Sequence, residues 1–308
     1  MPLFEDHDCM LADAHEDVVN QFVQSGMWIT FRRKLRSLCM ISRSHPETSR
    51  YFKSYSACRN EEVRHMLRHY YMIHPFSAFC LYWEFFMFFL FTALYVVIPV
   101  DASVVIMQKK DYIYYTKCVL DLMHVADMTK IFFTGYYHEE KSKVMLSPSK
   151  IAKRYLTSYF FFDLLSCIHS FMLLIRYFVT VDTLVLLAVR TLVLLKMVRL
   201  GRWVDIAELF RQYNGYSSYL FKGIKVIMVF FVVILWAFAI HFFVGHYFKH
   251  FRVHSEGEWG SEILESFFDA TMTLLLVSIL QDNINDIPEY INAILFLCFG
   301  FALQLFVY

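Results

Sequence analysis

Four basic residues lie at three-residue steps inside an otherwise apolar stretch: Arg190, Lys196, Arg199 and Arg202, with Val193 at the one step that carries no charge. Steps of three residues, at about 100° per residue, keep these side chains on one slowly winding stripe of a helix. Such a stripe can respond to a membrane potential, because each elementary charge moved through the field contributes about 2.3 kcal/mol per 100 mV. The spacing therefore predicts a voltage-sensing helix with these four residues as the sensing charges.

Acidic residues in two other apolar stretches offer partners for these cations. Asp121 and Asp127 lie in one stretch, where His124 and Lys130 continue the same three-residue steps, and Asp163 follows three phenylalanines in the other. A carboxylate among phenylalanines is costly to keep ionised, and a neighbouring Arg or Lys offsets that cost. We expect Asp121, Asp127 and Asp163 to be the counter-charges.

A static basic helix at the membrane surface is the alternative interpretation. Long Lys and Arg side chains snorkel to the cytosolic face of a membrane, which accounts for Arg199 and Arg202. Arg190 fits this alternative poorly, because it lies about 18 Å of helix away from Arg202. The sensor is therefore the favoured interpretation of the stripe.

The elements that must position these residues are apolar runs in a chain of 308 residues, of which 58% are hydrophobic and 19% aromatic. This is more apolar side chain than one soluble core needs. Six runs approach the length that crosses a bilayer. They cover about 79–100, 112–134, 155–178, 183–204, 224–248 and 288–308. Another run, Ile263–Leu280, is marginal for crossing and is flanked by acidic and polar residues, which is typical of a re-entrant helix.

The predicted fold is an all-α membrane protein with six transmembrane helices and a re-entrant pore helix. Residues 1–78 form a cytosolic N-terminal region, and residues 79–204 form a four-helix voltage sensor. Residues 205–308 form a two-helix pore domain, in which the re-entrant helix covers about 263–277 and the sixth helix is cut at residue 308. A re-entrant segment between the last two spans is the plan of a tetrameric cation pore.

The distribution of Lys and Arg predicts the orientation, although the formal net charge is only +1. Basic residues are frequent before residue 79 and in 135–154, whereas 101–111 has only two, and Lys and Arg favour the cytosolic side. We therefore expect a multi-pass protein of the plasma membrane with a cytosolic N-terminus and external segments at 101–111 and 249–262.

Several function classes find no support in the sequence. The chain has 9 Gly and no nucleotide-binding glycine loop, nucleophile motif or HExxH motif, so we expect neither an enzyme nor a metal site. Nothing points to a nucleic-acid partner. The 7 Cys lack paired spacing, which predicts reduced packing residues.

Three groups of motifs, within about residues 60–210, mark the ends of the first three spans. They are Ile73-His74-Pro75-Phe76-Ser77 with Phe79, Tyr82-Trp83-Glu84 and Ile98-Pro99-Val100; Asp127 with Thr134-Gly135; and Tyr155-Leu156-Thr157-Ser158 with Asp163. At these residues the chain resembles the hyperpolarisation-activated cyclic-nucleotide-gated channels of the voltage-gated-like cation channel superfamily.

The resemblance implies a voltage-gated channel for the monovalent cations potassium and sodium, assembled in the lipid bilayer as a homo- or hetero-tetramer of related subunits. The family's sensor helix carries a longer basic series, so the break at Val193 implies a weaker or shifted sensor. The family binds a cyclic nucleotide through a domain after the sixth span. The sequence stops at Tyr308, before such a domain, so either it is a fragment or the subunit lacks this regulation. The end within an apolar run favours a fragment, and we expect no cofactor in this chain.

The expected pore departs from the family. Phe268–Thr273 resembles the pore helix, with Thr271 and Thr273 as candidate pore residues. The family's filter is built on Gly-Tyr-Gly, whose carbonyls replace the water around potassium. The matching residues contain no glycine, and Ile and Leu are strained where the backbone needs positive φ. These candidate filter residues are Leu276, Val277, Ser278, Ile279, Leu280, Gln281 and Asp282.

Two other functions remain open beside a conducting channel. A non-conducting, silent subunit that regulates its partners is consistent with the divergent filter. A secondary transporter is the further alternative, but it normally has internal repeats and broken helices, and no such repeat is visible here.

Overall fold

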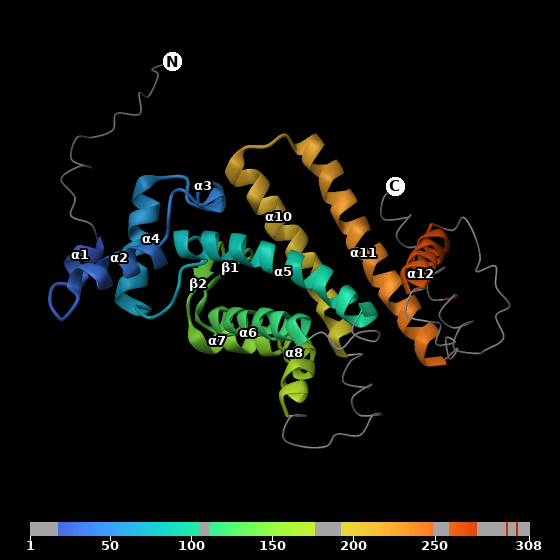
Figure 1. Ribbon diagram of the computed structural model, residues 1–308. Coiled ribbons are helices and arrows are strands. Elements are labelled where there is room, and N and C mark those ends of the chain that lie inside the picture. The colour runs from blue at the N-terminus through green and yellow to red at the C-terminus, as the bar shows by residue number, and fades with distance from the viewer. Residues whose placement is uncertain are drawn as a thin grey trace, which may run out of the picture. The chain divides into compact units, whose positions relative to one another are not determined.

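The computed structural model describes residues 18–104, 111–175, 192–248 and 259–275, together with 294 and 300 (Figure 1). The chain divides into two compact units: Met1–Phe85 with Asp127–Phe160, and Phe86–Ala126 with Phe161–Tyr308. Helices α5 (Ala78–Val104) and α6 (Asp111–Phe133) each run from one unit into the other.

The first unit contains short helices and one hairpin. Its remaining elements are α1 (Val18–Phe22), α2 (Ile29–Cys39), α3 (Pro46–Tyr51), α4 (Tyr55–Arg68), β1 (Tyr136–His138), β2 (Lys143–Met145) and α7 (Pro148–Leu156). The helix starts follow capping rules: the Ser54 hydroxyl accepts the Ala57 N–H at 3.2 Å before α4, and Pro46 occupies the first turn of α3.

The described residues are mostly helical, as predicted, and one short hairpin adds to them. Strands β1 and β2 pair antiparallel, with Tyr137 opposite Val144, and buried Val144 packs with Leu146 and Ile151 in an apolar core. Gly135, directly before β1, donates its N–H to the Ile73 carbonyl at 3.0 Å. A Cβ on Gly135 would lie 2.9 Å from the Met145 backbone carbonyl oxygen and 2.6 Å from Leu146 Cδ2, so a larger residue would push the two strands apart. The predicted cytosolic loop at 135–154 is therefore an ordered hairpin followed by α7.

A second core of the first unit is polar. Arg36 of α2 is only 8% exposed, and its guanidinium donates to the Met72 carbonyl at 3.0 Å. The same guanidinium contacts His65 Nε2 at 3.0 Å and lies 4.7 Å from the centre of the Tyr70 ring. On α4, Glu61 pairs with Arg64 and lies 3.5 Å from His74 Nε2. These contacts connect α2 and α4 to the segment before α5.

The long apolar helices follow the predicted spans. Within the described residues, two segments are long and apolar enough to cross a membrane, Ala78–Pro99 of α5 and Ser218–Phe242 of α11 (Ser218–Phe248). The predicted third span begins too early, because α7 ends at Leu156 and α8 covers Phe160–Ile175. In the predicted fourth span the described part begins with the 3-10 helix η2 (Leu192–Arg199), and α10 (Leu200–Asn214) continues beyond residue 204. The predicted sixth span lies outside the described residues, except for 294 and 300.

Helix α12 (Trp259–Leu274) packs against α11 within the second unit (Figure 1). Their shared core is apolar and includes Ala237, Phe238 and Phe242 of α11 with Ala270 and Leu274 of α12. This helix covers most of the predicted re-entrant segment, whose sequence has an apolar face of the right period.

Candidate functional site

The 3-10 helix η2 aligns two of the four predicted sensing cations, Lys196 and Arg199. A 3-10 helix has 3.0 residues per turn, so residues three apart eclipse one another, with a rise of about 2.0 Å per residue. Lys196 and Arg199 therefore lie one above the other, about 6 Å apart along the axis. Runs of this kind are usually shorter than the eight residues of η2, and they often mark functional hinges.

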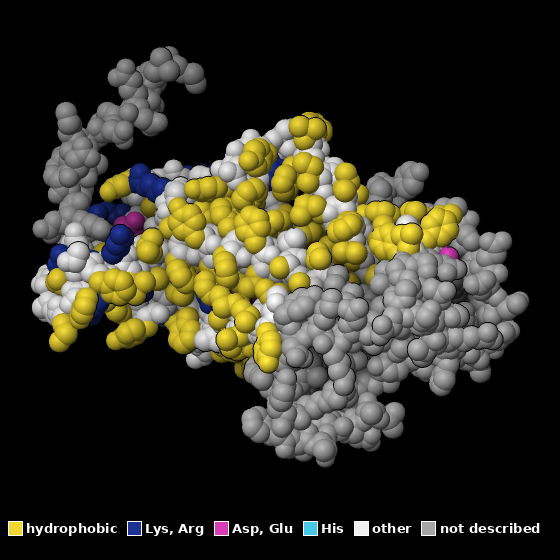
Figure 2. All heavy atoms as spheres, viewed as in Figure 1, with side chains coloured by type: hydrophobic (Ala, Val, Ile, Leu, Met, Phe, Trp, Pro, Cys, Tyr) yellow, Lys and Arg dark blue, Asp and Glu magenta, His cyan; other side chains and the backbone are white. Residues whose placement is uncertain are grey.

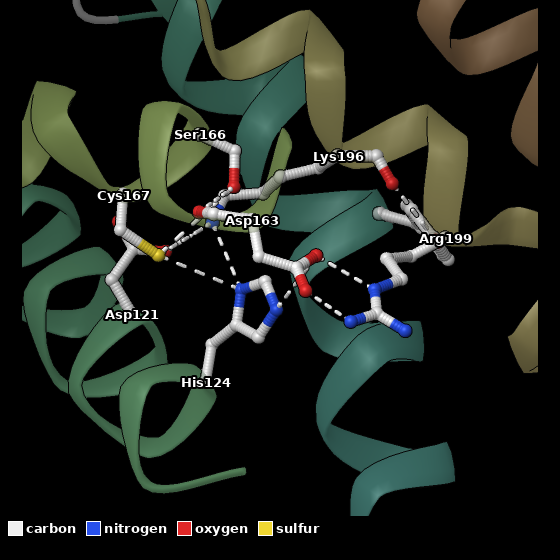
Figure 3. A network of polar contacts seen from close by, with 8 residues as sticks. Asp121, His124, Asp163, Ser166, Cys167, Lys196 and Arg199 are labelled. Carbon is white, nitrogen blue, oxygen red and sulfur yellow. Dashed lines mark hydrogen bonds and ion pairs between the residues drawn. The ribbon is translucent and has the colours of Figure 1, made fainter. Parts of the chain in front are cut away.

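The Lys196 ammonium sits among side chains of two other helices (Figure 3). Its Nζ lies 2.8 Å from Asp121 Oδ1 and 3.5 Å from His124 Nδ1, both on α6. Cys167 of α8 approaches the same nitrogen at 3.8 Å. Lys196 and Asp121 are each 3% exposed in their side chains, so this is a buried ion pair. The attraction between the two charges offsets much of the free energy that is lost when the ammonium is removed from water.

Arg199 makes a two-pronged pair with Asp163 of α8 (Figure 3). Its Nε donates to Asp163 Oδ1 at 2.6 Å, and its Nη2 donates to Oδ2. The planar guanidinium matches a carboxylate in this way, and a lysine in its place would lose one of the two bonds. His124 Nε2 lies 3.7 Å from Asp163 Oδ1, so His124 stands between the two ion pairs.

The backbone of η2 is held by aromatic side chains of the second unit. The Tyr95 hydroxyl donates to the Lys196 carbonyl at 3.3 Å, and Trp203 Nε1 donates to Thr92 Oγ1 at 2.9 Å. Phe88 stacks on Trp203 with ring centres 5.6 Å apart. These contacts fix the depth of the row of cations relative to α5.

The other predicted sensing residues differ in their surroundings. The guanidinium carbon of Arg202, in α10, lies 5.9 Å from the centre of the Phe91 ring. The Phe91 ring in turn contacts the His124 ring edge-on, with ring centres 5.5 Å apart. Cation and aromatic ring attract each other at this range. Arg190 lies outside the described residues.

The first unit holds the third predicted counter-charge, Asp127. Its Oδ1 accepts a hydrogen bond from Trp83 Nε1 at 2.9 Å. One turn further along α6, Lys130 Nζ lies 2.9 Å from Glu84 Oε1 of α5. The two contacts join α5 to α6 through side chains that are largely buried.

Two members of the network were not expected from sequence. Cys167 was interpreted only as a packing residue, although it follows Asp163 by four positions and therefore shares its helix face. Glu84 was noted only as part of a motif. His124 was part of the predicted stripe, and its place between two ion pairs was not foreseen.

The predicted pore residues are described only in part. Both threonines of α12 turn their hydroxyls to their own helix: Thr271 Oγ1 donates to the Phe267 carbonyl at 2.7 Å, and Thr273 Oγ1 to the Asp269 carbonyl at 2.8 Å. Gly300 comes so close to α12 that a Cβ would lie 2.3 Å from the Leu274 carbonyl oxygen. The candidate filter, Leu276–Asp282, lies outside the described residues.

Comparison with known proteins gives a consistent result. The family model described as Ion transport protein matches residues 80–308. The human potassium/sodium hyperpolarization-activated cyclic nucleotide-gated channel 1 is 30% identical over 119 residues, which is 39% of this chain and 13% of the relative. Channel 4 of Homo sapiens is 29% identical over 119 residues, again 39% of this chain and 10% of the relative. Channel 2 of Mus musculus is 30% identical over 39% of this chain and 14% of the relative.

These matches confirm the resemblance expected from the motifs. The aligned part of the chain spans only a small fraction of each relative, between 10% and 14% of its length. The family match and the relatives indicate a membrane protein related to voltage-gated ion channels, and the structure agrees in being mostly helical.

Proposed function

The chain belongs to the ion transport protein family, and from this premise we propose that it is a subunit of a tetrameric voltage-gated channel for monovalent cations. In this proposal the chain has six spans and a re-entrant pore helix. Residues 79–204 are the sensor and residues 205–308 the pore domain, in which α12 is the pore helix. Potassium and sodium are the proposed ions, because the relatives carry both in their names.

One observation carries the proposal: two stacked cations of η2 are paired with carboxylates of two different helices. Because Lys196 and Arg199 stand one 3-10 turn apart, a shift of η2 by one turn, about 6 Å, would bring one of these cations near the present place of the other. The cations could thus move through the field while carboxylates remain within reach. Each charge that crosses the whole field contributes about 2.3 kcal/mol per 100 mV.

The surroundings of the row support movement between discrete positions. Asp121 belongs to α6 and Asp163 to α8, so the two carboxylates stand on elements separate from the cations. A cation that leaves one of these carboxylates and reaches the other is paired again, which avoids the cost of leaving that cation buried alone. Arg190, Arg202 and Asp127 are proposed to take part in other states of the sensor.

A gating measurement tests the sensor directly. A dye on a cysteine placed at Asp182 should report a voltage-driven change, and Lys196→Gln should flatten its voltage dependence. Lys153→Gln is the matched control, because Lys153 is an exposed lysine of α7. If the wild-type chain gives no voltage-driven signal at all, the static basic helix replaces the sensor.

The proposed topology has a cytosolic N-terminus and a cytosolic hairpin at 136–145, in a protein of the plasma membrane. This follows from the excess of Lys and Arg in these segments. A cysteine placed at Lys143 should resist an impermeant external reagent in intact cells. Its labelling under those conditions would contradict the orientation and leave the sensor mechanism untouched.

A silent regulatory subunit is the second candidate, because the matching filter residues lack glycine. Side chains at Ser278 and Leu280 would restrict the backbone angles and crowd the axis on which carbonyl oxygens face the ion. The chain expressed alone should give little potassium-selective current. The double substitution Ser278→Gly with Leu280→Gly should raise that current if the filter alone is defective, whereas a robust current from the unmodified subunit contradicts the silent role.

A further inference from the structure

Helix α2 exposes a set of apolar side chains and buries one of its four basic residues. Arg36 is buried in the polar core, while Phe31, Leu35 and Leu38 are exposed on the opposite side. Residues spaced by four and three positions share one helix face, so these three side chains form a continuous apolar strip. Burying an arginine and exposing a strip of apolar side chains is costly unless the strip meets something other than water.

The turn before α2 adds two exposed apolar side chains next to this strip in the sequence. Met27 and Trp28 are 83% and 75% exposed, and Trp28 adopts a left-handed backbone with φ of 61°. This conformation is costly for a bulky residue other than glycine. We call these five residues, Met27, Trp28, Phe31, Leu35 and Leu38, the α2 outer face.

Cations flank the α2 outer face on both sides. At about 100° per residue, Lys34 lies on one side of Phe31 and Arg32 on the other, and both are exposed. From Val18 to Pro46 the chain has five Lys and Arg residues and no Asp or Glu. Figure 2 shows dark-blue Lys and Arg side chains gathered over the α1 and α2 end, beside hydrophobic ones.

A hollow beside Arg32 adds a place for an anionic headgroup. It has a volume of about 460 Å³, and its lining includes Gln24, Ser25, Tyr70 and Arg32. The guanidinium, the amide and the hydroxyl groups of this lining are all hydrogen-bond donors, and phosphate and carboxylate oxygens are acceptors.

We propose that the α2 outer face lies in the surface of an anionic membrane, with its apolar side chains in the lipid and Arg32 and Lys34 among the headgroups. An apolar strip flanked by cations is the pattern of helices that lie in the plane of the interface, and tryptophan favours the same depth. The partner is a phosphatidylserine-rich leaflet, because residues 18–46 carry five basic and no acidic side chains and the chain is itself a membrane protein.

This inference takes from the proposed function only the choice of the cytosolic leaflet. The test uses the full chain in vesicles of phosphatidylcholine, alone or with phosphatidylserine, and a brominated phosphatidylcholine as quencher. The contribution of Trp28 is the difference between the wild-type chain and Trp28→Phe. Because both leaflets of such a vesicle have the same lipids, a wrong topology does not affect the result.

Bromolipid should quench Trp28 strongly in the anionic vesicles and weakly in the neutral ones. The double variant Arg32→Gln with Lys34→Gln should shift the docking equilibrium about thirtyfold toward the undocked state, which corresponds to about 1 kcal/mol for each cation. Both side chains are exposed, so the variant leaves the polar core intact. Lys53→Gln, an exposed lysine between α3 and α4, is the matched control and should change little.

Two outcomes would overturn the proposal. Trp28 that stays unquenched in every bilayer would mean that the α2 outer face covers a protein surface. Equal quenching with and without phosphatidylserine, unaffected by the double variant, would mean that the flanking cations recognise no anionic lipid.

Discussion

Two groups of buried cations, Lys196 with Arg199 in the second unit and Arg36 in the first, are satisfied by different kinds of bond. In the second unit, Lys196 and Arg199 pair with Asp121 and Asp163, which are side chains on separate helices. In the first unit, Arg36 instead donates to a backbone carbonyl at Met72. A carboxylate partner can be exchanged for another carboxylate when a helix slides, whereas a backbone partner fixes its donor to one place.

The histidines of the two units also differ in their surroundings. His45 and His65 of the first unit are buried, and loss of hydration lowers the pKa of His45 to about 4 and that of His65 to about 3, despite the opposing charges of Glu84 and Glu61. Both are therefore neutral at pH 7. In the second unit His124 stands between two ion pairs, 3.7 Å from the Asp163 carboxylate. The first region is a rigid polar core and the second is a row of exchangeable pairs.

The largest expected effect is the removal of a carboxylate from the row of pairs. Asp163→Asn should cost about 3–5 kcal/mol of folding free energy, because it leaves the Arg199 guanidinium buried without its ionised partner. Thermal unfolding in detergent or nanodiscs would measure it. Asp205→Asn, an exposed aspartate of α10, is the matched control. A stability loss below about 1 kcal/mol would place Arg199 in contact with water or another anion.

Acidification should weaken the first unit. A histidine whose folded pKa lies below its unfolded value of 6.5 contributes stability that is fully present above pH 6.5 and is lost as pH falls toward the folded pKa. As the pH falls from 6.5 to about 4, His45 and His65 should each lower the free energy of unfolding by about 1.4 kcal/mol per pH unit. Hydrogen exchange of α4 amides, corrected for intrinsic rates, would measure this loss.

A substitution at His45 separates the two contributions. His45 Nδ1 accepts the Glu47 N–H at 3.2 Å at the start of α3, and asparagine can cap a helix in the same way without titrating. His45→Asn should therefore remove the His45 share of the pH dependence and keep α3. An unchanged pH dependence would assign the whole effect to His65 and His74.

The two arginines should respond differently to lysine. Arg36→Lys should lower the free energy of unfolding by about 1.5–3 kcal/mol. A single ammonium cannot replace the planar guanidinium, which contacts the Met72 carbonyl, His65 and the Tyr70 ring at once. Arg199→Lys should cost less, since the ammonium still pairs with Asp163. Unfolding measurements on the two variants compare the regions directly, and an equal loss would contradict the distinction between fixed and exchangeable partners.

The smallest expected effect concerns the hydrogen bond between Trp203 and Thr92, which joins α10 to α5 beside the paired cations. Trp203→Phe keeps a ring to stack on Phe88 and removes the hydrogen bond to Thr92, which should cost about 1 kcal/mol. Thr92→Val removes the same bond from the other side, so a double-mutant cycle should give less than the sum of the two losses. Additive losses would show that the bond contributes nothing to stability.

Much of the helical layout could be predicted because it depends on local patterns. The apolar run predicted at 79–100 lies within α5, and the run at 224–248 lies within α11. The predicted re-entrant segment overlaps α12 over most of its length. The short hairpin was missed, because strands of three residues are held by the packing of Val144 and the close approach at Gly135.

The sequence by itself determined which residues are charged inside apolar helices and that they repeat every third position. It left Asp121, Asp127 and Asp163 as equivalent partners, because spacing along one helix does not say which residues of another helix stand at the same depth. The tertiary structure decided this: Asp121 faces Lys196, Asp163 faces Arg199, and Asp127 accepts from Trp83. It also made η2 a 3-10 helix, which aligns residues three apart, whereas an α-helix would wind them slowly around its axis.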